Sequence, residues 1–254
     1  MAKIVVFDSG LGSISIIKEI KKIMKTDIVY FADQKNYPYG NKSQAQIASI
    51  IKKTINTLEK KFTPDVIVVA SNTPSLMLNL QTGRIIDVKP PLKLAQKKSK
   101  SKKIGILATK ASVNSKGLEN YVKENNIPKS YKIFKINGSN LVDLVESGKF
   151  LNNKKYCKKI IKKSLDDYII TEKIDVITLS STHLLFLKTL LEKEFPQVEF
   201  IDPGSLVAKK IFLKIKNKQS KRNSLKIFTS GNIINFKNKL NKIGIKNKIN
   251  YLST

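Results

Sequence analysis

The stretch Asp65–Ser75, DVIVVASNTPS, decides the fold. A continuous β-branched run from Val66 to Val69 is typical of a parallel strand that is covered on both faces. Small polar residues follow at once, from Ser71 to Thr73, and open α/β sheets bind ligands at the carboxyl ends of their strands. The stretch therefore predicts a buried strand that leads directly into a binding site.

The same pattern occurs a second time. Asp175–His183, DVITLSSTH, repeats the aspartate, the aliphatic run, the small polar pair and the threonine. Likewise, Lys3–Ser9, KIVVFDS, is matched by Lys103–Thr109, KIGILAT. These pairs indicate an internal duplication in which strands alternate with helices. We expect an α/β fold of two similar three-layer lobes with mostly parallel sheets, related by pseudo-two-fold symmetry, with a ligand cleft between them.

The expected lobes are residues 1–94 with 208–254, and residues 95–207. The lysine-rich stretch Lys89–Lys103, which contains Pro90 and Pro91, reads as the crossing between them. Apolar runs predict strands at residues 3–7, 27–32, 66–69, 103–108, 131–136, 175–179, 198–201 and 226–229. Helical spacing predicts helices at residues 13–25, 43–60, from about 75, 112–125, 141–147, 153–168, 184–194, 205–216 and 232–242, with Ser43 as an N-cap.

Composition narrows the class of protein. An apolar content of 41% in 254 residues is enough for a core, and no run approaches the ~20 apolar residues of a membrane helix. The first residues enter a strand and lack the features of a signal peptide, so we expect a soluble, cytoplasmic protein without membrane contact. One cysteine, Cys157, and one histidine, His183, exclude a disulfide framework, a thiolate metal cluster and a His-rich metal site.

The formal charge is +29, and only Arg84 and Arg222 are arginines, so nearly all the basic residues are lysines. Nucleic-acid surfaces usually use arginine and interleave aromatic residues. The lysines here are spread along helices, and the densest run, Lys89–Lys103, contains no aromatic residue. We interpret the charge as a solvated, composition-driven surface, and expect only weak, salt-sensitive and non-specific binding of nucleic acid.

Two local features are candidates for ligand binding or acid/base catalysis. The turn Asp8-Ser9-Gly10-Leu11-Gly12 completes neither the P-loop nor the dinucleotide motif, which argues against nucleotide binding. Its N–H groups at a helix start suit a small carboxylate, although a plain strand-to-helix turn accounts for it equally well. A lone histidine is more often structural, but His183 directly follows a predicted strand end, where an acid/base group would be useful.

An ordered set of motifs runs along most of the chain, and together they resemble the glutamate racemases of the aspartate/glutamate racemase superfamily. The motifs are Phe7–Gly12, Pro38–Gly40, Ala70–Thr73, Ala108–Ser115, Leu144–Glu146, Ser181–His183, Ile201–Gly204 and Thr229–Gly231.

The resemblance implies a cofactor-independent isomerase that takes the α-proton from one face of glutamate and returns one to the other, supplying D-glutamate for cell-wall peptidoglycan. It implies that Asp8 supports the first base, and that His183 with Glu146 supports the second. It further implies a homodimer and no metal. The residues implied to hold the amino acid are Ser9, Tyr39, Gly40, Asn72, Thr73, Ser112 and Thr182.

The chain departs from the family at both bases, because the two cysteine positions are Ser71 and Ser181. A thiol has a pKa of ~8.5, whereas a serine hydroxyl lies nearer water's ~15.7. Forming the alkoxide therefore costs about 10 kcal/mol more than forming the thiolate. We expect racemisation to be impaired in this chain.

Three explanations of the serines stay open: deliberate substitution of two cysteines, natural loss of catalysis in a relative that binds its ligand, or a slower or different reaction of the superfamily. The alternative functions are a non-catalytic protein that binds an amino acid or dicarboxylate, and an aspartate racemase-like enzyme.

Overall fold

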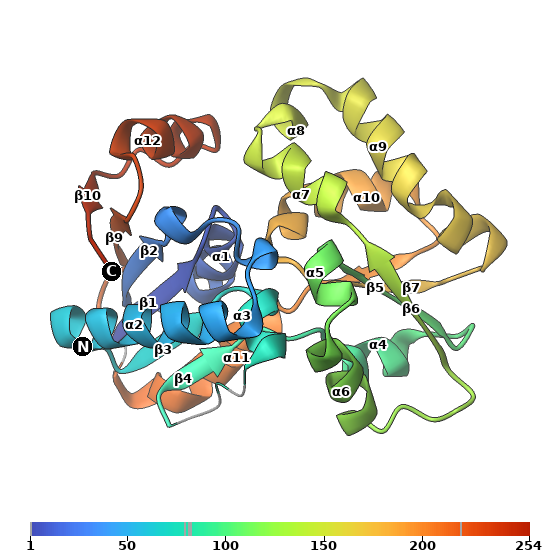
Figure 1. Cartoon of the computed structure of the whole chain (residues 1–254), viewed down its shortest axis with the longest axis horizontal. Coiled ribbons are helices and arrows are strands. Elements are labelled where there is room, and N and C mark those ends of the chain that lie inside the picture. The colour runs from blue at the N-terminus through green and yellow to red at the C-terminus, as the bar shows by residue number, and fades with distance from the viewer. Residues whose placement is uncertain (1, 79, 81–82, 219) are drawn as a thin grey trace. The chain divides into compact units, whose positions relative to one another are not determined.

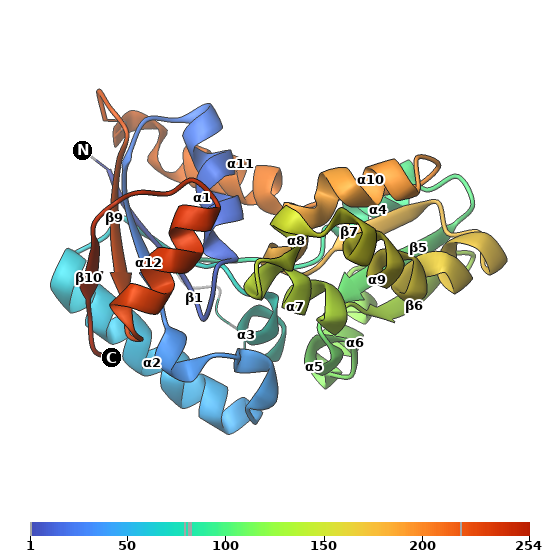
Figure 2. The ribbon, with the colours of Figure 1, turned by 90° about the horizontal axis from the view of Figure 1, so that it is seen from above.

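The computed structural model describes residues 2–78, 80, 83–218 and 220–254. The chain forms two compact units, Met1–Val88 with Gly204–Thr254 (unit 1) and Lys89–Pro203 (unit 2). Each unit is a parallel sheet with helices on its faces (Figures 1 and 2). Among the described residues, no helix is both long and apolar enough to cross a membrane.

Unit 1 contains a six-stranded sheet in the order β10-β9-β2-β1-β3-β4, and every pairing is parallel. Its strands are β1 (Lys3–Asp8), β2 (Asp27–Ala32), β3 (Val66–Val69), β4 (Ile85–Asp87), β9 (Ser224–Thr229) and β10 (Ile249–Tyr251). Its α-helices are α1 (Ser13–Ile23), α2 (Gln44–Phe62), α3 (Asn72–Met77), α11 (Gly204–Ile215) and α12 (Ile233–Lys242).

The alternation of side chains along the strands gives the sheet of unit 1 two buried faces. Val5 and Phe7 of β1 pack in one cluster with Ile47 and Ile51 of α2. On the other face, Tyr30 of β2 contacts the ring of Phe236 in α12 with the ring centroids 5.9 Å apart. Successive strand residues point to opposite faces, so the aliphatic runs of β1 and β3 fill both layers, as their composition predicts.

Unit 2 contains a four-stranded parallel sheet in the order β6-β5-β7-β8. Its strands are β5 (Lys103–Ala108), β6 (Lys132–Asn137), β7 (Val176–Leu179) and β8 (Glu199–Ile201). Its helices are α4 (Leu92–Lys98), α5 (Lys110–Val113), α6 (Lys116–Glu124), α7 (Ser139–Glu146), α8 (Lys149–Asn152), α9 (Lys154–Asp166), a π-helix η3 (Asp167–Thr171), a 3₁₀ helix η4 (Thr182–Leu187) and α10 (Lys188–Glu194).

The duplication predicted from sequence is visible in the topology. The order β2-β1-β3-β4 inside the first sheet corresponds to the order β6-β5-β7-β8 in the second. β1 pairs with β3 from Ile4–Val66 onward, and β5 pairs with β7 from Ile104–Val176 onward, over four residues each. The predicted fold class of two similar, mostly parallel α/β lobes is confirmed.

Local sequence explains where several helices begin. At the start of α2 the Ser43 hydroxyl accepts the Gln46 N–H at 3.3 Å, and the Gln46 side chain accepts the Ser43 N–H at 2.9 Å. This capping box satisfies two N–H groups that the first turn leaves unpaired, and it confirms Ser43 as the predicted N-cap.

Several predicted elements differ from the structure. The helix expected over residues 112–125 is divided into α5 and α6, because the Ser115 hydroxyl accepts the Leu118 N–H at 3.1 Å and starts a new helix. The helix expected over residues 184–194 begins as the 3₁₀ helix η4. The short strands β4 and β10 were not predicted, because three residues are too few to show a period.

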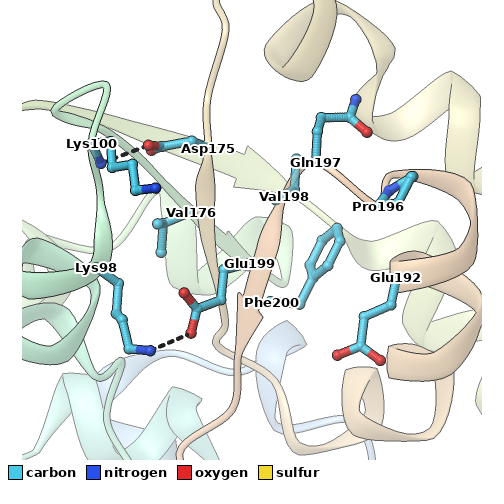
Figure 3. Close-up of a pocket in the computed structure, with 10 residues that line it drawn as sticks. All are labelled: Lys98, Lys100, Asp175, Val176, Glu192, Pro196, Gln197, Val198, Glu199 and Phe200. Carbon is cyan, nitrogen blue, oxygen red and sulfur yellow. Dashed lines mark hydrogen bonds and ion pairs between the residues drawn. The ribbon is translucent and has the colours of Figure 1, made fainter.

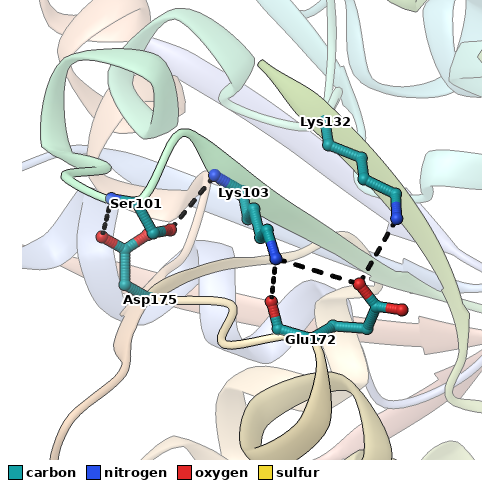
Figure 4. Close-up of polar contacts among 5 residues, drawn as sticks. All are labelled: Ser101, Lys103, Lys132, Glu172 and Asp175. Atoms are coloured by element: carbon teal, nitrogen blue, oxygen red, sulfur yellow. Dashed lines mark hydrogen bonds and ion pairs between the residues drawn. The ribbon is translucent and has the colours of Figure 1, made fainter. Parts of the chain in front are cut away.

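The aspartate that begins each repeated stretch accepts hydrogen bonds that hold the amino end of a central strand in place. The Asp175 carboxylate accepts the Ser99 hydroxyl at 2.7 Å, the Ser101 hydroxyl at 2.7 Å and the Lys100 N–H at 2.7 Å. Figure 4 shows this carboxylate beside Ser101, with Lys103 and Lys132 directed at Glu172. In unit 1, Asp65 likewise accepts the Lys3 N–H at 3.0 Å.

Burial alone would raise the pKa of Asp175, but its hydrogen bonds from Ser101, Ser99 and Lys100 outweigh that effect and hold the pKa below its ordinary value. A carboxyl group whose pKa is lowered by folding stabilises the native state above its unfolded pKa. That stability is lost as the pH falls through the native pKa.

We therefore expect Asp175→Asn to lower the free energy of unfolding by about 1 to 2 kcal/mol at pH 7, because a charged acceptor of several hydrogen bonds is lost. The deficit should shrink as the pH falls below about 4, where the wild-type carboxyl also becomes neutral. Urea unfolding at pH 7, 5 and 3.5 measures both effects. Asp143→Asn, at an exposed position of α7, is the control, and equal stability of Asp175→Asn and wild type at pH 7 would contradict the assignment.

Candidate active site

In unit 1, polar residues gather at the carboxyl ends of three neighbouring strands. β1 ends at Asp8 and β3 is followed by Ser71, and these strands are adjacent in the sheet. β2 lies on the other side of β1 and is followed by Asp33, whose N–H donates to the Asp8 carbonyl at 2.8 Å. Asp8, Asp33 and Asn72 are all buried. This edge of the sheet is therefore polar although it is shielded from water.

The Asp8 carboxylate organises the glycine-rich turn. It accepts the Gly10 N–H at 3.2 Å and the Ser13 N–H at 3.0 Å. The turn therefore wraps around a carboxylate of the chain itself, and two of the N–H groups that we expected to offer to a ligand already have this acceptor. Ser9, the next residue of this turn after Asp8, is also buried.

Tyr39 is held by a buried carboxylate. Its hydroxyl donates to Asp33 at 2.9 Å, and the Ser230 hydroxyl donates to the same carboxylate at 2.9 Å. Asn36 donates to both oxygens of Asp33 at 2.9 and 3.0 Å. Burial, the charge and hydrogen bond of Asp33, and the charge of Asp8 raise the pKa of Tyr39 well above its ordinary value. Tyr39 therefore stays a phenol whose proton points at Asp33.

Asp33 and Ser230 were not among the predicted site residues. The signal was present, since Asp33 directly follows β2 and Ser230 directly follows β9, and both are the first polar side chains after a strand. β9 and β2 are neighbours in the sheet, although they lie far apart in sequence. Pairing of these two strands brings Ser230 to Asp33, and no short-range pattern predicts that pairing.

Ser71 and Ser181 occupy equivalent places in the two units. Ser71 precedes α3 with φ −142° and ψ 127°, and Ser181 precedes η4 with φ −144° and ψ 132°. Within the described chain, neither side chain caps the helix that follows it. The residue before each serine donates its N–H to the neighbouring strand at 2.8 Å, Ala70 to Phe7 and Ser180 to Leu107. Both hydroxyls therefore project from a strand tip with the same backbone geometry.

Asn72, which follows Ser71, has a buried and unsatisfied amide. Its side chain is 3% exposed, and neither Oδ1 nor Nδ2 has a hydrogen-bond partner among the described residues. An unpaired buried polar group typically costs about 1 to 3 kcal/mol. Native proteins retain few such groups, and each calls for an explanation. An ordered water or a polar ligand that both donates and accepts would satisfy this amide.

In unit 2, a histidine and a glutamate form a buried pair. His183 Nε2 lies 2.7 Å from Glu146 Oε1, and the side chains are 11% and 9% exposed. η4 carries His183 immediately after β7, and Glu146 is the last residue of α7. A carboxylate in this position orients the ring and stabilises its protonated form. The structure thus joins two residues that the sequence separates by 37 positions.

The other predicted residues are divided between the two units. Ser112 is the third residue of α5, and its N–H donates to the hydroxyl of the N-cap Thr109 at 3.3 Å, while the Thr109 hydroxyl donates to the Ser112 hydroxyl at 3.0 Å. Thr182 is buried beside His183 in η4. Of the predicted residues, unit 1 contains Asp8, Ser9, Tyr39, Gly40, Ser71, Asn72 and Thr73, and unit 2 contains Ser112, Glu146, Ser181, Thr182 and His183.

Unit 2 also has a pocket of about 460 Å³ at the amino ends of β7 and β8. Figure 3 shows the Phe200 ring in it and Lys98 paired with Glu199 at 3.1 Å. The pocket lies at the edge of the sheet away from His183, because Asp175 precedes β7 and His183 follows it. It is therefore separate from the predicted site. In the described ranges, no three His, Cys, Asp or Glu side chains are placed to bind a metal ion.

Comparison with known proteins identifies the family. No protein-family model matches the sequence. The glutamate racemase of Leptospira borgpetersenii is 30% identical over 232 residues, which cover 88% of this chain and 86% of that protein. The chain belongs to the glutamate racemase family. The glutamate racemase of Sulfurihydrogenibium is 33% identical over 205 residues, covering 78% of this chain and 76% of that protein.

Solved structures agree with this assignment in their fold. Glutamate racemase isoform RacE1 from Bacillus anthracis superimposes with a TM-score of 0.84 at 24% identity, covering 99% of this chain and 97% of that one. The chain therefore shares the fold of that protein. The relatives at 30% and 33% identity confirm the family membership predicted from sequence.

The hydrogen bond from Tyr39 to the buried Asp33, and the raised pKa of Tyr39, can be tested by substitution. We expect Tyr39→Phe to lower the free energy of unfolding by about 1 to 3 kcal/mol at pH 7, because the buried Asp33 loses a donor. A pKa raised by folding makes the wild type lose stability as the pH rises above about 10, where unfolded tyrosine ionises. The deficit of Tyr39→Phe should therefore narrow between pH 10 and 11.5.

Urea unfolding across that range measures the effect. Tyr251→Phe is the control, because Tyr251 is 56% exposed. If the stability deficits of Tyr39→Phe and Tyr251→Phe change equally between pH 10 and 11.5, Tyr39 does not have the raised pKa assigned to it.

Proposed function

We propose that this chain racemises glutamate without a cofactor, by proton transfer at Cα between two bases. Ser71 is the base of one face and Ser181 that of the other, supported by Asp8 in unit 1 and by His183 with Glu146 in unit 2. The proposal is supported most by the two serines, which project from equivalent strand tips with nearly identical backbone angles in the two units. A reaction that treats the two faces of one carbon alike needs such a matched pair.

The other site residues would bind the substrate rather than exchange its proton. We propose that Ser9, Gly40, Asn72, Thr73, Ser112 and Thr182 hold the ammonium and carboxylate groups. The Tyr39 proton is directed at Asp33, so the Tyr39 oxygen would accept a hydrogen bond from the substrate and would not donate one. A charged ammonium is a suitable donor for it.

The two serines would make proton transfer at Cα slow. A hydroxyl is a far weaker acid than a thiol, and the difference of about 10 kcal/mol corresponds to a factor of ~10⁷ if nothing compensates. We propose that the chain binds glutamate and exchanges its α-proton slowly. D-glutamate for peptidoglycan would be the product, made in the cytoplasm. The homodimer implied by the resemblance and the choice of glutamate over aspartate stay predictions.

We expect the double variant Ser71→Cys with Ser181→Cys to racemise glutamate at least about 10³-fold faster than the parent chain, because thiolates form far more readily near neutral pH. The measurement is incorporation of deuterium at Cα of L- and D-glutamate, followed by NMR together with chiral analysis. Cys157→Ser in every variant removes the unrelated thiol as a source of exchange.

Three outcomes of that experiment are distinct. Faster exchange with glutamate supports the proposal, and exchange with aspartate alone identifies an aspartate racemase instead. If the double variant binds glutamate but exchanges neither amino acid, the chain is a binding protein and the enzymatic proposal fails.

Asn72→Ala tests ligand binding separately from catalysis. Removal of an unsatisfied buried amide should leave the free energy of unfolding within about 1 kcal/mol of wild type, while the affinity for glutamate falls at least tenfold. Calorimetry with L- and D-glutamate measures the affinity. In the control Asn125→Ala, the lost amide donates to the Tyr121 carbonyl at 2.7 Å, so stability should fall with binding unchanged. Unaltered glutamate affinity in Asn72→Ala would remove this residue from the site.

A further inference from the structure

The helix α9 concentrates positive charge on one surface of unit 2. Its sequence is KKYCKKIIKKSLD, and its six lysines, Lys154, Lys155, Lys158, Lys159, Lys162 and Lys163, are all exposed. The opposite side of the helix is buried in the core through Cys157, Ile161 and Leu165. Figures 1 and 2 show α9 along the outside of its unit, beside α7, α8 and α10. We call this set of six lysines the α9 lysine face.

The charge of the α9 lysine face is little compensated within the chain. Among the residues that the structure describes, Lys158 is the one lysine of this face with an ion pair, to Glu194 at 3.0 Å, and Asp166 is the single acidic residue of the helix. The lysines repeat at i and i+4, which places them about 6 Å apart along the axis. Like charges at this spacing repel each other and destabilise a helix. An anionic partner would relieve that repulsion.

The first turn of α9 strengthens the positive potential. It contains Lys154 and Lys155 and no acidic residue, at the end of the helix where the macrodipole is already positive. Lys149 of α8 lies nearby, with its ammonium 5.4 Å from the centroid of the Tyr156 ring. Tyr156 is 39% exposed. The α9 lysine face thus combines regularly spaced cations with an exposed aromatic ring.

From these observations we propose that the α9 lysine face binds the phosphodiester backbone of nucleic acid without sequence selectivity. Regularly spaced lysines suit a regular row of phosphates, and an exposed tyrosine offers a surface on which a base can stack. Without arginine, the face lacks the bidentate contacts that read base edges. A membrane surface fits less well, because the apolar side of α9 is packed in the core and is not available for insertion.

This inference refines the interpretation of the overall charge. A uniformly basic surface would bind polyanions through any of its lysines. The structure instead predicts that one helix contributes most of the contact. It is independent of racemisation, because no α9 residue belongs to the proposed catalytic or binding groups.

Two variants of equal charge test the proposal. The α9 variant replaces Lys154, Lys155, Lys159, Lys162 and Lys163 by Gln and keeps Lys158 for its pair with Glu194. The control variant replaces five exposed lysines of unit 1, Lys52, Lys53, Lys209, Lys214 and Lys237, by Gln. Glutamine keeps a helix propensity close to that of lysine. Thermal unfolding of both variants verifies that they are folded.

Binding to a fluorescent 20-nucleotide single strand and to a 20-base-pair duplex is measured between 50 and 200 mM salt. We expect the α9 variant to bind at least tenfold more weakly than wild type, with a salt slope for the duplex reduced by about 2 to 4, since each lost phosphate contact removes about 0.9. The control variant should change the slope by less than about 1.

Two results would overturn the proposal. An equal loss of affinity in both variants would assign binding to overall charge. Binding of the wild type through α9 to vesicles rich in anionic phosphatidylserine, without binding to either oligonucleotide, would identify a membrane partner instead.

Discussion

Parallel pairing of the central strands is the constraint on which the rest of each unit depends. β1 pairs with β3 and β5 pairs with β7 in the same register. Because side chains alternate along a strand, a shift by one residue would exchange its core and outer positions. It would also change the position of Ser71 relative to the end of β1, and that of Ser181 relative to the end of β5. Asp65 and Asp175 accept hydrogen bonds from neighbouring segments at the amino ends of these strands. These bonds help to hold the register of each strand, on which the position of the serine after its carboxyl end depends.

Three acidic side chains are buried near the carboxyl ends of the strands, and each of them has hydrogen-bond partners. Asp8 is held by two backbone N–H groups, Asp33 by Tyr39 and Ser230, and Glu146 by His183. Burying a charge without such partners would cost far more than a domain can sustain. The hydrogen bonds that make burial of these polar groups tolerable also fix the orientation of their side chains. The amide of Asn72 differs, because neither of its polar atoms has a hydrogen-bond partner among the described residues, and the proposed substrate contact would supply one.

The sequence predicted those features that depend on short-range patterns. Periodicity located the central strands, the capping residue Ser43 marked the start of α2, and polar residues after β-branched runs marked the strand tips. Features that depend on tertiary contacts were not predicted. Ser230 reaches Asp33 across 197 residues of sequence, and β4 and β10 are strands only because a neighbour pairs with them. The contact between Glu146 and His183 was expected from the resemblance to the racemases and not from any spacing in the chain.

The two halves of the proposed reaction are chemically unequal, although their backbones match. In unit 1 the carboxylate near the serine, Asp8, already accepts two N–H groups, and a carboxylate is a weak base for a hydroxyl. In unit 2 the group near the serine is an imidazole, and the imidazolium formed on taking a proton would be stabilised by Glu146 at 2.7 Å. The backbone thus places two hydroxyls equivalently, while the side chains behind them differ in their capacity to take a proton. In the proposed reaction, the hydroxyl of Ser71 would therefore have the weaker base behind it, and the transfer that depends on Ser71 would limit the rate.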